Sequence, residues 1–122
     1  MSKILIVEDY VNIQQVYQTA LSFEGYDVAV ASDGKQALEM VERHEPDLIL
    51  LDLLMANIGG LEFLKTFDLT KHPHTKVIVI SSLSSPELAK EAATLGAHAY
   101  LTKSDFTPKE LVAVIKQTLA EA

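Results

Sequence analysis

Acidic and other polar side chains in this sequence follow runs of almost solidly apolar residues. Glu8 is the last residue of the run KILIVE at 3–8, and Asp9 follows it. Asp52 ends the run LILLD at 48–52. The run VIVIS at 77–81 ends in Ser81, and the short segment HAYL at 98–101 leads to Lys103. Carboxylates, a hydroxyl and an ammonium are the groups that could bind a divalent cation and a phosphoryl group together.

Three carboxylates that share a partly buried pocket repel one another strongly, and a divalent cation removes that repulsion. Oxygen ligands without Cys or His favour Mg²⁺, with Mn²⁺ as a further option. The Lys103 ammonium and the Ser81 hydroxyl suit the oxygens of a phosphoryl group. Asp52 can then act as a nucleophile that forms an acyl phosphate. The sequence therefore predicts a phosphoryl acceptor at Asp52 and a metal site at Glu8, Asp9 and Asp52.

These side chains meet only if the runs that carry them are neighbouring strands. The apolar runs predict central strands at 3–8, 48–52 and 77–81, and the alternating YDVAVA at 26–31 predicts a strand nearer an edge. Helical spacing and cap residues predict helices over 10–24, 33–44, 61–67, 85–95 and 107–119. Strands that alternate with helices indicate an α/β fold, a single doubly wound domain with a parallel five-stranded sheet. Its chemistry gathers at the carboxyl ends of the strands.

Helix ends and helix faces also follow from local patterns. Asp33 with Gln36, and Thr107 with Glu110, resemble capping boxes, and Pro86 and Pro108 suit the first helical position. In the first helix, the apolar residues stand at mostly helical spacing: Val11, Ile13, Val16, Tyr17, Ala20, Leu21 and Phe23.

Composition narrows the class of protein. The chain has 122 residues, a net charge of −7 and no cysteine. A length of this order suits one domain, and the negative charge gives no reason for direct contact with nucleic acid or an anionic membrane. The N-terminus does not resemble a signal peptide, and no apolar run approaches transmembrane length. We expect a soluble, cytoplasmic protein without disulfides.

Four segments, in this order and spacing, resemble the receiver domain of bacterial two-component response regulators. They are ILIVED at 4–9, PDLILLDLLM at 46–55, VIVISS at 77–82 and GAHAYLTK at 96–103. The resemblance covers nearly the whole chain, which is expected to be one receiver domain over 1–122. It implies a flavodoxin-like (βα)5 fold with strand order 2-1-3-4-5.

The resemblance also implies a role for each matching residue. Asp52 would accept phosphate from a phosphohistidine on a sensor histidine kinase or phosphotransfer protein. Asp9, Asp52 and the backbone carbonyl of Leu54 would bind Mg²⁺ directly, and Glu8 would act mostly through water. Ser81 and Lys103 would hold the phosphoryl oxygens, and Ser81 with Tyr100 would form the switch. A downstream protein partner would bind the face formed by 85–95, 98–101 and 107–119.

The chain departs from the family pattern at several positions. Ala56 follows Met55 where the family commonly has proline, which predicts a looser loop. Ser104 follows Lys103 where a proline, often cis, is usual; a cis bond here would cost roughly 2.5–4 kcal/mol, so the bond is either trans or strained. His98 and Ala99 replace acids of the winged-helix DNA-binding subgroup, so its charged dimer interface is not expected. Ser82 stands where the family commonly has a small apolar residue, and Leu54 is apolar, so both positions are expected to affect the access of water to an acyl phosphate.

Other interpretations remain open at this point. Glu8 and Asp9 could simply cap the following helix. A phosphatase of the haloacid-dehalogenase type also uses an aspartate nucleophile, but it needs a second Asp where Leu54 stands. A phosphate-independent scaffold of the same fold would keep these residues without using them. The leading hypothesis is a regulatory domain, not an enzyme, which catalyses only its own phosphoryl transfer and dephosphorylation and thereby changes its partner-binding face.

Overall fold

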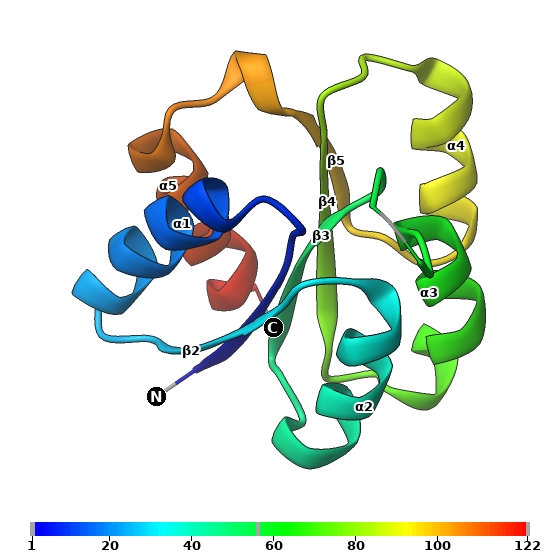
Figure 1. Cartoon of the computed structure of the whole chain (residues 1–122), viewed down its shortest axis with the longest axis horizontal. Coiled ribbons are helices and arrows are strands. Elements are labelled where there is room, and N and C mark those ends of the chain that lie inside the picture. The colour runs from blue at the N-terminus through cyan, green and yellow to red at the C-terminus, as the bar shows by residue number, and fades with distance from the viewer. Residues whose placement is uncertain (1, 56, 122) are drawn as a thin grey trace.

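The computed structural model describes residues 2–55 and 57–121, which form five strands and five α-helices in alternation (Figure 1). The strands are β1 (Lys3–Val7), β2 (Asp27–Ala31), β3 (Leu48–Asp52), β4 (Lys76–Ser81) and β5 (Ala99–Thr102). The helices are α1 (Val11–Phe23), α2 (Gly34–His44), α3 (Gly60–Phe67), α4 (Pro86–Thr94) and α5 (Pro108–Ala120). Two short 3₁₀ turns, η1 (Leu69–Lys71) and η2 (Lys103–Asp105), complete the order.

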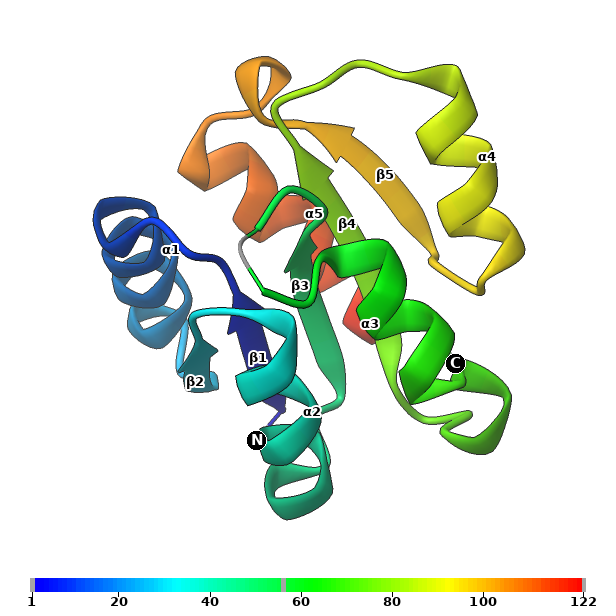
Figure 2. The same ribbon diagram turned by 45° about the vertical axis from the view of Figure 1, so that its right-hand side comes forward.

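The five strands form one parallel sheet in the order β2-β1-β3-β4-β5, which Figure 2 shows from one side. Val7 pairs with Leu51, and Ser81 pairs with Thr102. The strands therefore end at the same edge, and the residues that follow them share that edge. This confirms the predicted α/β doubly wound fold and its strand order.

The sheet is covered on both faces because successive strand residues point to opposite sides. On one face, Leu5, Ile49 and Val77 pack with buried residues of α2, α3 and α4. On the other face, Ile4, Leu48 and Ile78 pack with buried residues of α1 and α5. Figure 1 shows the same division, with α1 and α5 on one side of the sheet. The uninterrupted apolar runs of β1, β3 and β4 are thus explained by burial on two sides.

The helix predicted at 10–24 is present as α1, but its apolar spacing marks the buried face only in part. Val16 is exposed and Phe23 is 88% exposed. Val11 is exposed as well. The buried residues are instead Gln14 and Leu21, with Tyr17 half-buried between them. Gln14, Tyr17 and Leu21 are three and four residues apart, so they share one face of the helix. Val16 and Phe23, seven residues apart, share a different face.

The predicted cap residues Asp33, Ser85 and Thr107 are confirmed, but the box at Asp33 is incomplete because the Gln36 side chain accepts from Ser32 instead of Asp33. Asp33 accepts from the backbone N–H of Gln36 at 2.8 Å, and Thr107 forms a complete capping box with Glu110. Ser85 caps α4, which begins at Pro86. The Lys103–Ser104 bond is trans, so the first of the two alternatives for that bond is confirmed. Among the described residues, no helix is both long and apolar enough to span a membrane.

Candidate functional site

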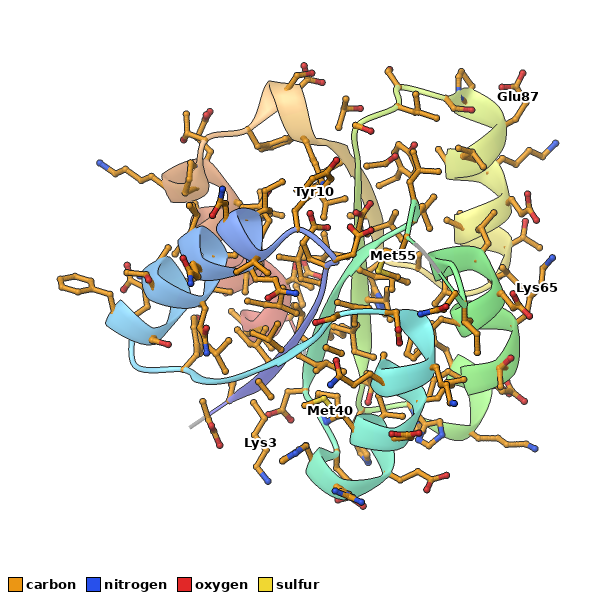
Figure 3. The ribbon with its side chains drawn as sticks, viewed as in Figure 1. Lys3, Tyr10, Met40, Met55, Lys65 and Glu87 are labelled. Atoms are coloured by element: carbon orange, nitrogen blue, oxygen red, sulfur yellow. The ribbon has the colours of Figure 1, made fainter. Side chains whose placement is uncertain are left out.

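Three carboxylates meet at the carboxyl edge of the sheet. Glu8 and Asp9 follow β1, Asp52 ends β3, and one ligand oxygen from each lies within 4.8 Å of the others. Glu8 is 2% exposed and Asp52 is 3% exposed. In Figure 3, Tyr10 and Met55 lie toward this edge, and Lys3 lies toward the opposite one. The pairing of β1 with β3 brings these carboxylates together as the sequence predicted.

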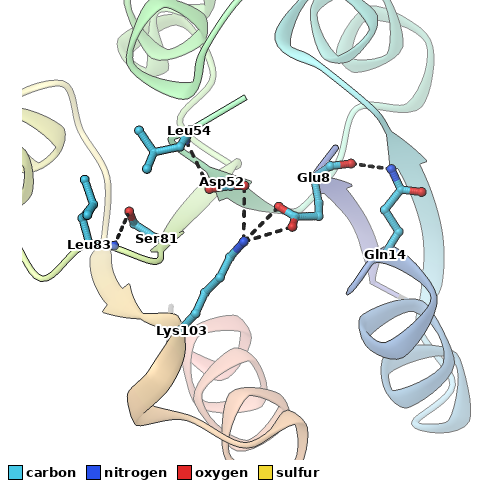
Figure 4. Close-up of polar contacts among 7 residues, drawn as sticks. All are labelled: Glu8, Gln14, Asp52, Leu54, Ser81, Leu83 and Lys103. Atoms are coloured by element: carbon cyan, nitrogen blue, oxygen red, sulfur yellow. Dashed lines mark hydrogen bonds and ion pairs between the residues drawn. The ribbon is translucent and has the colours of Figure 1, made fainter. Parts of the chain in front are cut away.

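Lys103 lies opposite the carboxylates (Figure 4). Its Nζ is 3.0 Å from Oε1 of Glu8 and 3.3 Å from Oδ2 of Asp52. The Lys103 side chain is 18% exposed, so both ion pairs are largely shielded from water. The predicted opposition of an ammonium to the acidic cluster is therefore present in the folded chain.

The electrostatics of the cluster favour an additional positive charge. Burial, reinforced by the Asp52 carboxylate, raises the pKa of Glu8 to about 8, and Lys103 offsets this only in part. Burial disfavours the charged form of Lys103, but Glu8 and Asp52 outweigh it and raise the pKa of its ammonium. One ammonium therefore leaves the site short of positive charge at neutral pH.

A divalent cation fits this donor set. Oδ1 of Asp9 is buried and has no hydrogen-bond partner among the residues that the structure describes. A buried carboxylate oxygen without a partner destabilises the folded state unless a proton donor or a cation binds it. Carboxylate oxygens without nitrogen or sulfur ligands suit a hard ion. The acidic cluster can therefore hold a metal ion.

Leu54 contributes its backbone to the same site. Its N–H donates to Oδ1 of Asp52 at 3.2 Å, and its side chain is 48% exposed. This hydrogen bond fixes the turn that leaves β3. The loop continues through Met55 to Ala56, and Ala56, where the sequence departs from the family pattern, lies outside the described residues.

Ser81 and Tyr100 contact the same residue. The buried Ser81 hydroxyl accepts from the backbone N–H of Leu83 at 3.1 Å, and the Tyr100 hydroxyl donates to the carbonyl of Leu83 at 2.5 Å. Tyr100 is half-buried. The predicted switch residues are thus linked through one backbone unit, which sequence reasoning did not single out because it acts through backbone atoms.

Gln14 is a further polar residue that sequence reasoning missed. Its side chain is buried, and its Nε2 donates to the backbone carbonyl of Glu8 and to Ser32 Oγ, the latter at 3.2 Å. The available signal was its spacing of three and seven residues from Tyr17 and Leu21, which places it on the inward face of α1.

Comparison with known proteins agrees with this geometry. Residues 4–116 match the model of the response regulator receiver domain. The chain belongs to this family. The receiver domain is 38% identical over 119 residues to response regulator ArlR of Staphylococcus saprophyticus, covering 98% of this chain and 53% of that protein. It is 37% identical over 118 residues to the alkaline phosphatase synthesis transcriptional regulatory protein PhoP of Bacillus subtilis, covering 96% of this chain and 48% of PhoP.

Solved structures carry the same fold. A CheY-like receiver domain from Methanospirillum hungatei matches the receiver domain with a TM-score of 0.90 at 30% identity, covering 98% of this chain and 94% of that one. Chemotaxis protein CheY4 of Vibrio cholerae matches with a TM-score of 0.88 at 30% identity, covering 96% and 98%. The chain spans about half the length of the curated relatives it matches. Family membership is consistent with a phosphorylation-activated signalling switch and favours neither the scaffold nor the phosphatase.

Proposed function

We propose that this receiver domain accepts a phosphoryl group on Asp52 from a phosphohistidine of a sensor kinase or phosphotransfer protein. The observation that carries the proposal is the convergence of Glu8, Asp9 and Asp52 within 4.8 Å, with Lys103 Nζ 3.3 Å from Asp52. A structural ion pair alone would need one carboxylate for one ammonium. The excess of buried carboxylate oxygens suits a site that receives Mg²⁺ and a phosphoryl group.

In the proposed transfer, a carboxylate oxygen of Asp52 attacks phosphorus. The P–N bond to the donor histidine breaks, its electron pair stays on the imidazole nitrogen, and an acyl phosphate forms. Asp9, Asp52 and the Leu54 carbonyl would hold Mg²⁺, which would supply positive charge to the phosphoryl oxygens. Glu8 would contact the Mg²⁺ mostly through a bound water molecule. Lys103 then faces the phosphoryl oxygens, and water later hydrolyses the acyl phosphate within the same site.

Leu83 would transmit the effect of phosphorylation from Ser81 to Tyr100, because its backbone contacts both side chains. Ser81 would bind a phosphoryl oxygen by donating its O–H, while its oxygen can go on accepting from the Leu83 N–H, as it does at 3.1 Å in the structure. A shift of Ser81 toward the phosphoryl group would carry Leu83 with it, and because Leu83 also accepts from Tyr100, this shift would change the contact that holds the Tyr100 ring. We infer that Tyr100 turns inward and that the face formed by α4, β5 and α5 changes its affinity for a downstream protein.

Partner contacts follow from charge and exposure. The exposed apolar side chains of Tyr10, Leu54 and Leu83 stand near the site and suit the approach of the phosphodonor. Relatives named as transcriptional regulators suggest that the output reaches transcription. With a net charge of −7, this domain would do so through a separate DNA-binding part or partner.

The experiment is labelling with acetyl phosphate, followed by intact-mass measurement. We expect one added phosphoryl group in Mg²⁺ and none in excess EDTA or in Asp52→Asn. Asp27→Asn, an exposed aspartate at the start of β2, serves as the matched control and keeps full labelling. Undiminished labelling of Asp52→Asn would overturn the assignment of the acceptor.

The scaffold and phosphatase hypotheses make different predictions for the same samples. A scaffold would show no label in any variant and no Mg²⁺-dependent shifts in NMR spectra. A phosphatase would turn over many equivalents of a phosphate ester. Leu54 stands where that class requires an acid, so we expect no such turnover.

A further inference from the structure

The turn between β2 and α2 touches both segments that carry the proposed site. On one side, Asn57 Nδ2 in the loop after β3 donates to Asp33 Oδ2 at 2.7 Å. Beside it, the backbone N–H of Gly34 donates to the carbonyl of Ile58 at 2.9 Å. A Cβ at Gly34 would lie 2.3 Å from that carbonyl oxygen, so only glycine allows this approach. The loop after β3 is thus docked onto the turn by one side-chain bond and one backbone bond.

The same turn reaches the segment after β1. Ser32 Oγ accepts from Gln14, whose amide also donates to the backbone carbonyl of Glu8. The N–H of Ser32 donates to Oε1 of Gln36 at 2.6 Å, and the N–H of Gln36 donates to Oδ1 of Asp33 at 2.8 Å. Hydrogen bonds therefore run without interruption from the backbone at Glu8 to the side chain of Asn57.

The backbone at Asn57 explains why this position needs its particular side chain. Asn57 has φ of 61°, in the left-handed region that asparagine tolerates better than most residues. Its amide is at the same time the donor to Asp33. The N–H of Gln36 and the Asn57 amide hold the pKa of Asp33 below its ordinary value, so the acceptor stays ionised over the neutral range.

We propose that Asp33 and Asn57 are positioning residues for the Mg²⁺ and phosphoryl site, acting by holding the loop that carries Leu54 against the β2–α2 turn. The inference rests on the proposed function, because Leu54 matters here as a predicted carbonyl ligand. The Asp33–Asn57 contact restrains the loop after β3 through side chains, and position 56 of the sequence carries alanine rather than the ring-restrained proline. It touches neither the metal nor the phosphoryl group.

Two single variants break the contact with opposite changes of charge. Asp33→Ser keeps a helix-capping hydroxyl for the Gln36 N–H, but it is too short to reach Asn57 as well, and it removes a negative charge. Asn57→Asp tolerates the left-handed backbone, sets two carboxylates against each other, and adds a negative charge. We expect each variant to weaken Mg²⁺ binding about tenfold, at the lower end of the loss seen when outer partners of metal ligands are removed.

Combining Asp33→Asn with Asn57→Asp exchanges donor and acceptor. The new amide at 33 can accept from Gln36 and donate to the new carboxylate, and the net charge returns to that of the wild type. We expect this double variant to recover Mg²⁺ affinity to within about twofold. Asp68→Ser is the matched control, because Asp68 caps η1 and accepts from Thr70 in a comparable turn far from the site.

Mg²⁺ dissociation constants are measured by NMR titration, and hydrogen exchange of the Leu54, Asn57 and Ile58 amides is measured without metal. Faster exchange in both single variants, with recovery in the double variant, supports the proposal. Opposite shifts of Mg²⁺ affinity in the two single variants would show a pure charge effect and overturn it. Equal weakening by Asp68→Ser would also overturn it. If the wild type binds no Mg²⁺, the proposed function fails, and the exchange data alone decide whether the contact holds the loop.

Discussion

The ammonium of Lys103 lies 3.3 Å from Oδ2 of Asp52, although 51 residues separate the two along the chain. Lys103 directly follows β5 and Asp52 ends β3, with β4 between the two strands in the sheet. Their contact therefore requires β3, β4 and β5 to be paired side by side in the sheet. It places a positive charge at the proposed acceptor before any phosphoryl group arrives.

Loss of this ammonium should have opposite effects on stability and on metal binding. In Lys103→Met, the buried carboxyl groups of Glu8 and Asp52 lose their hydrogen-bond donor, so we expect the free energy of unfolding of the metal-free protein to fall by about 1–3 kcal/mol. Mg²⁺ should bind more tightly, because a competing positive charge is gone. Urea unfolding without metal and NMR titration with Mg²⁺ measure the two effects.

Lys90→Met provides the comparison for that variant, since Lys90 is exposed on α4. We expect Lys90→Met to change neither the free energy of unfolding nor the affinity for Mg²⁺. Unaltered Mg²⁺ affinity in Lys103→Met would contradict the close opposition of the ammonium to the metal site.

The stability of the metal-free protein should fall as pH rises from about 5 to about 8.5. The pKa of Glu8 is raised from 4.5 to about 8, so the folded state binds this proton more tightly than the unfolded state does. The resulting stabilisation is present below the unfolded pKa and is lost as pH rises through the folded one. Asp33, Asp68 and Glu110 have lowered pKa values, and their contributions change only at more acidic pH.

Denaturation at a series of pH values in EDTA measures this slope. Glu8→Gln removes the titrating group and should flatten the dependence, and saturating Mg²⁺ should flatten it by favouring the carboxylate. A slope that survives in Glu8→Gln would assign the effect to other groups.

Tyr100→Phe should favour the activated conformation if Tyr100 turns inward. The substitution removes only the hydroxyl that donates to the Leu83 carbonyl, a bond that the proposed turn of Tyr100 would break. A hydrogen bond of this kind contributes about 0.5–1 kcal/mol, so we expect beryllofluoride, a phosphoryl mimic, to bind about two- to fivefold more tightly.

Tyr26→Phe is the control, because Tyr26 precedes β2 at the opposite edge of the sheet, and it should leave beryllofluoride affinity unchanged. Weaker binding to Tyr100→Phe would mean that the hydroxyl supports the activated state instead.

Gly34→Ala should destabilise the fold through a steric clash. Its Cβ would lie 2.3 Å from the carbonyl oxygen of Ile58, and backbone must move to accept it. Overpacking of this kind costs about 1–3 kcal/mol. Gly59→Ala, whose Cβ would approach the Leu53 carbonyl only to 3.4 Å, should cost less than about 1 kcal/mol. Chemical denaturation of both variants tests the difference, and equal losses would contradict the close approach at Gly34.

Strands, caps and the order of elements could be predicted because their signals are local. The run LILLD fills β3 completely, and Thr107, Pro108 and Glu110 mark the start of α5 within four residues. The meeting of Glu8, Asp9, Asp52 and Lys103 was also predictable, since parallel strands expose their carboxyl ends at one edge. Its prediction depended on placing β1 beside β3, which came from the family pattern.

Contacts that depend on helix rotation and loop docking were decided by tertiary structure. Phe23 follows the helical spacing of the apolar residues in α1, yet it is exposed, and Gln14 and Leu21 are the residues that α1 buries. Leu83 links Ser81 to Tyr100 through backbone atoms, and Asn57 meets Asp33 across 24 residues. The sequence by itself determined which residue types stand at the ends of the strands. Only the folded chain determined which of them touch, because a contact depends on distances and orientations that no local pattern encodes.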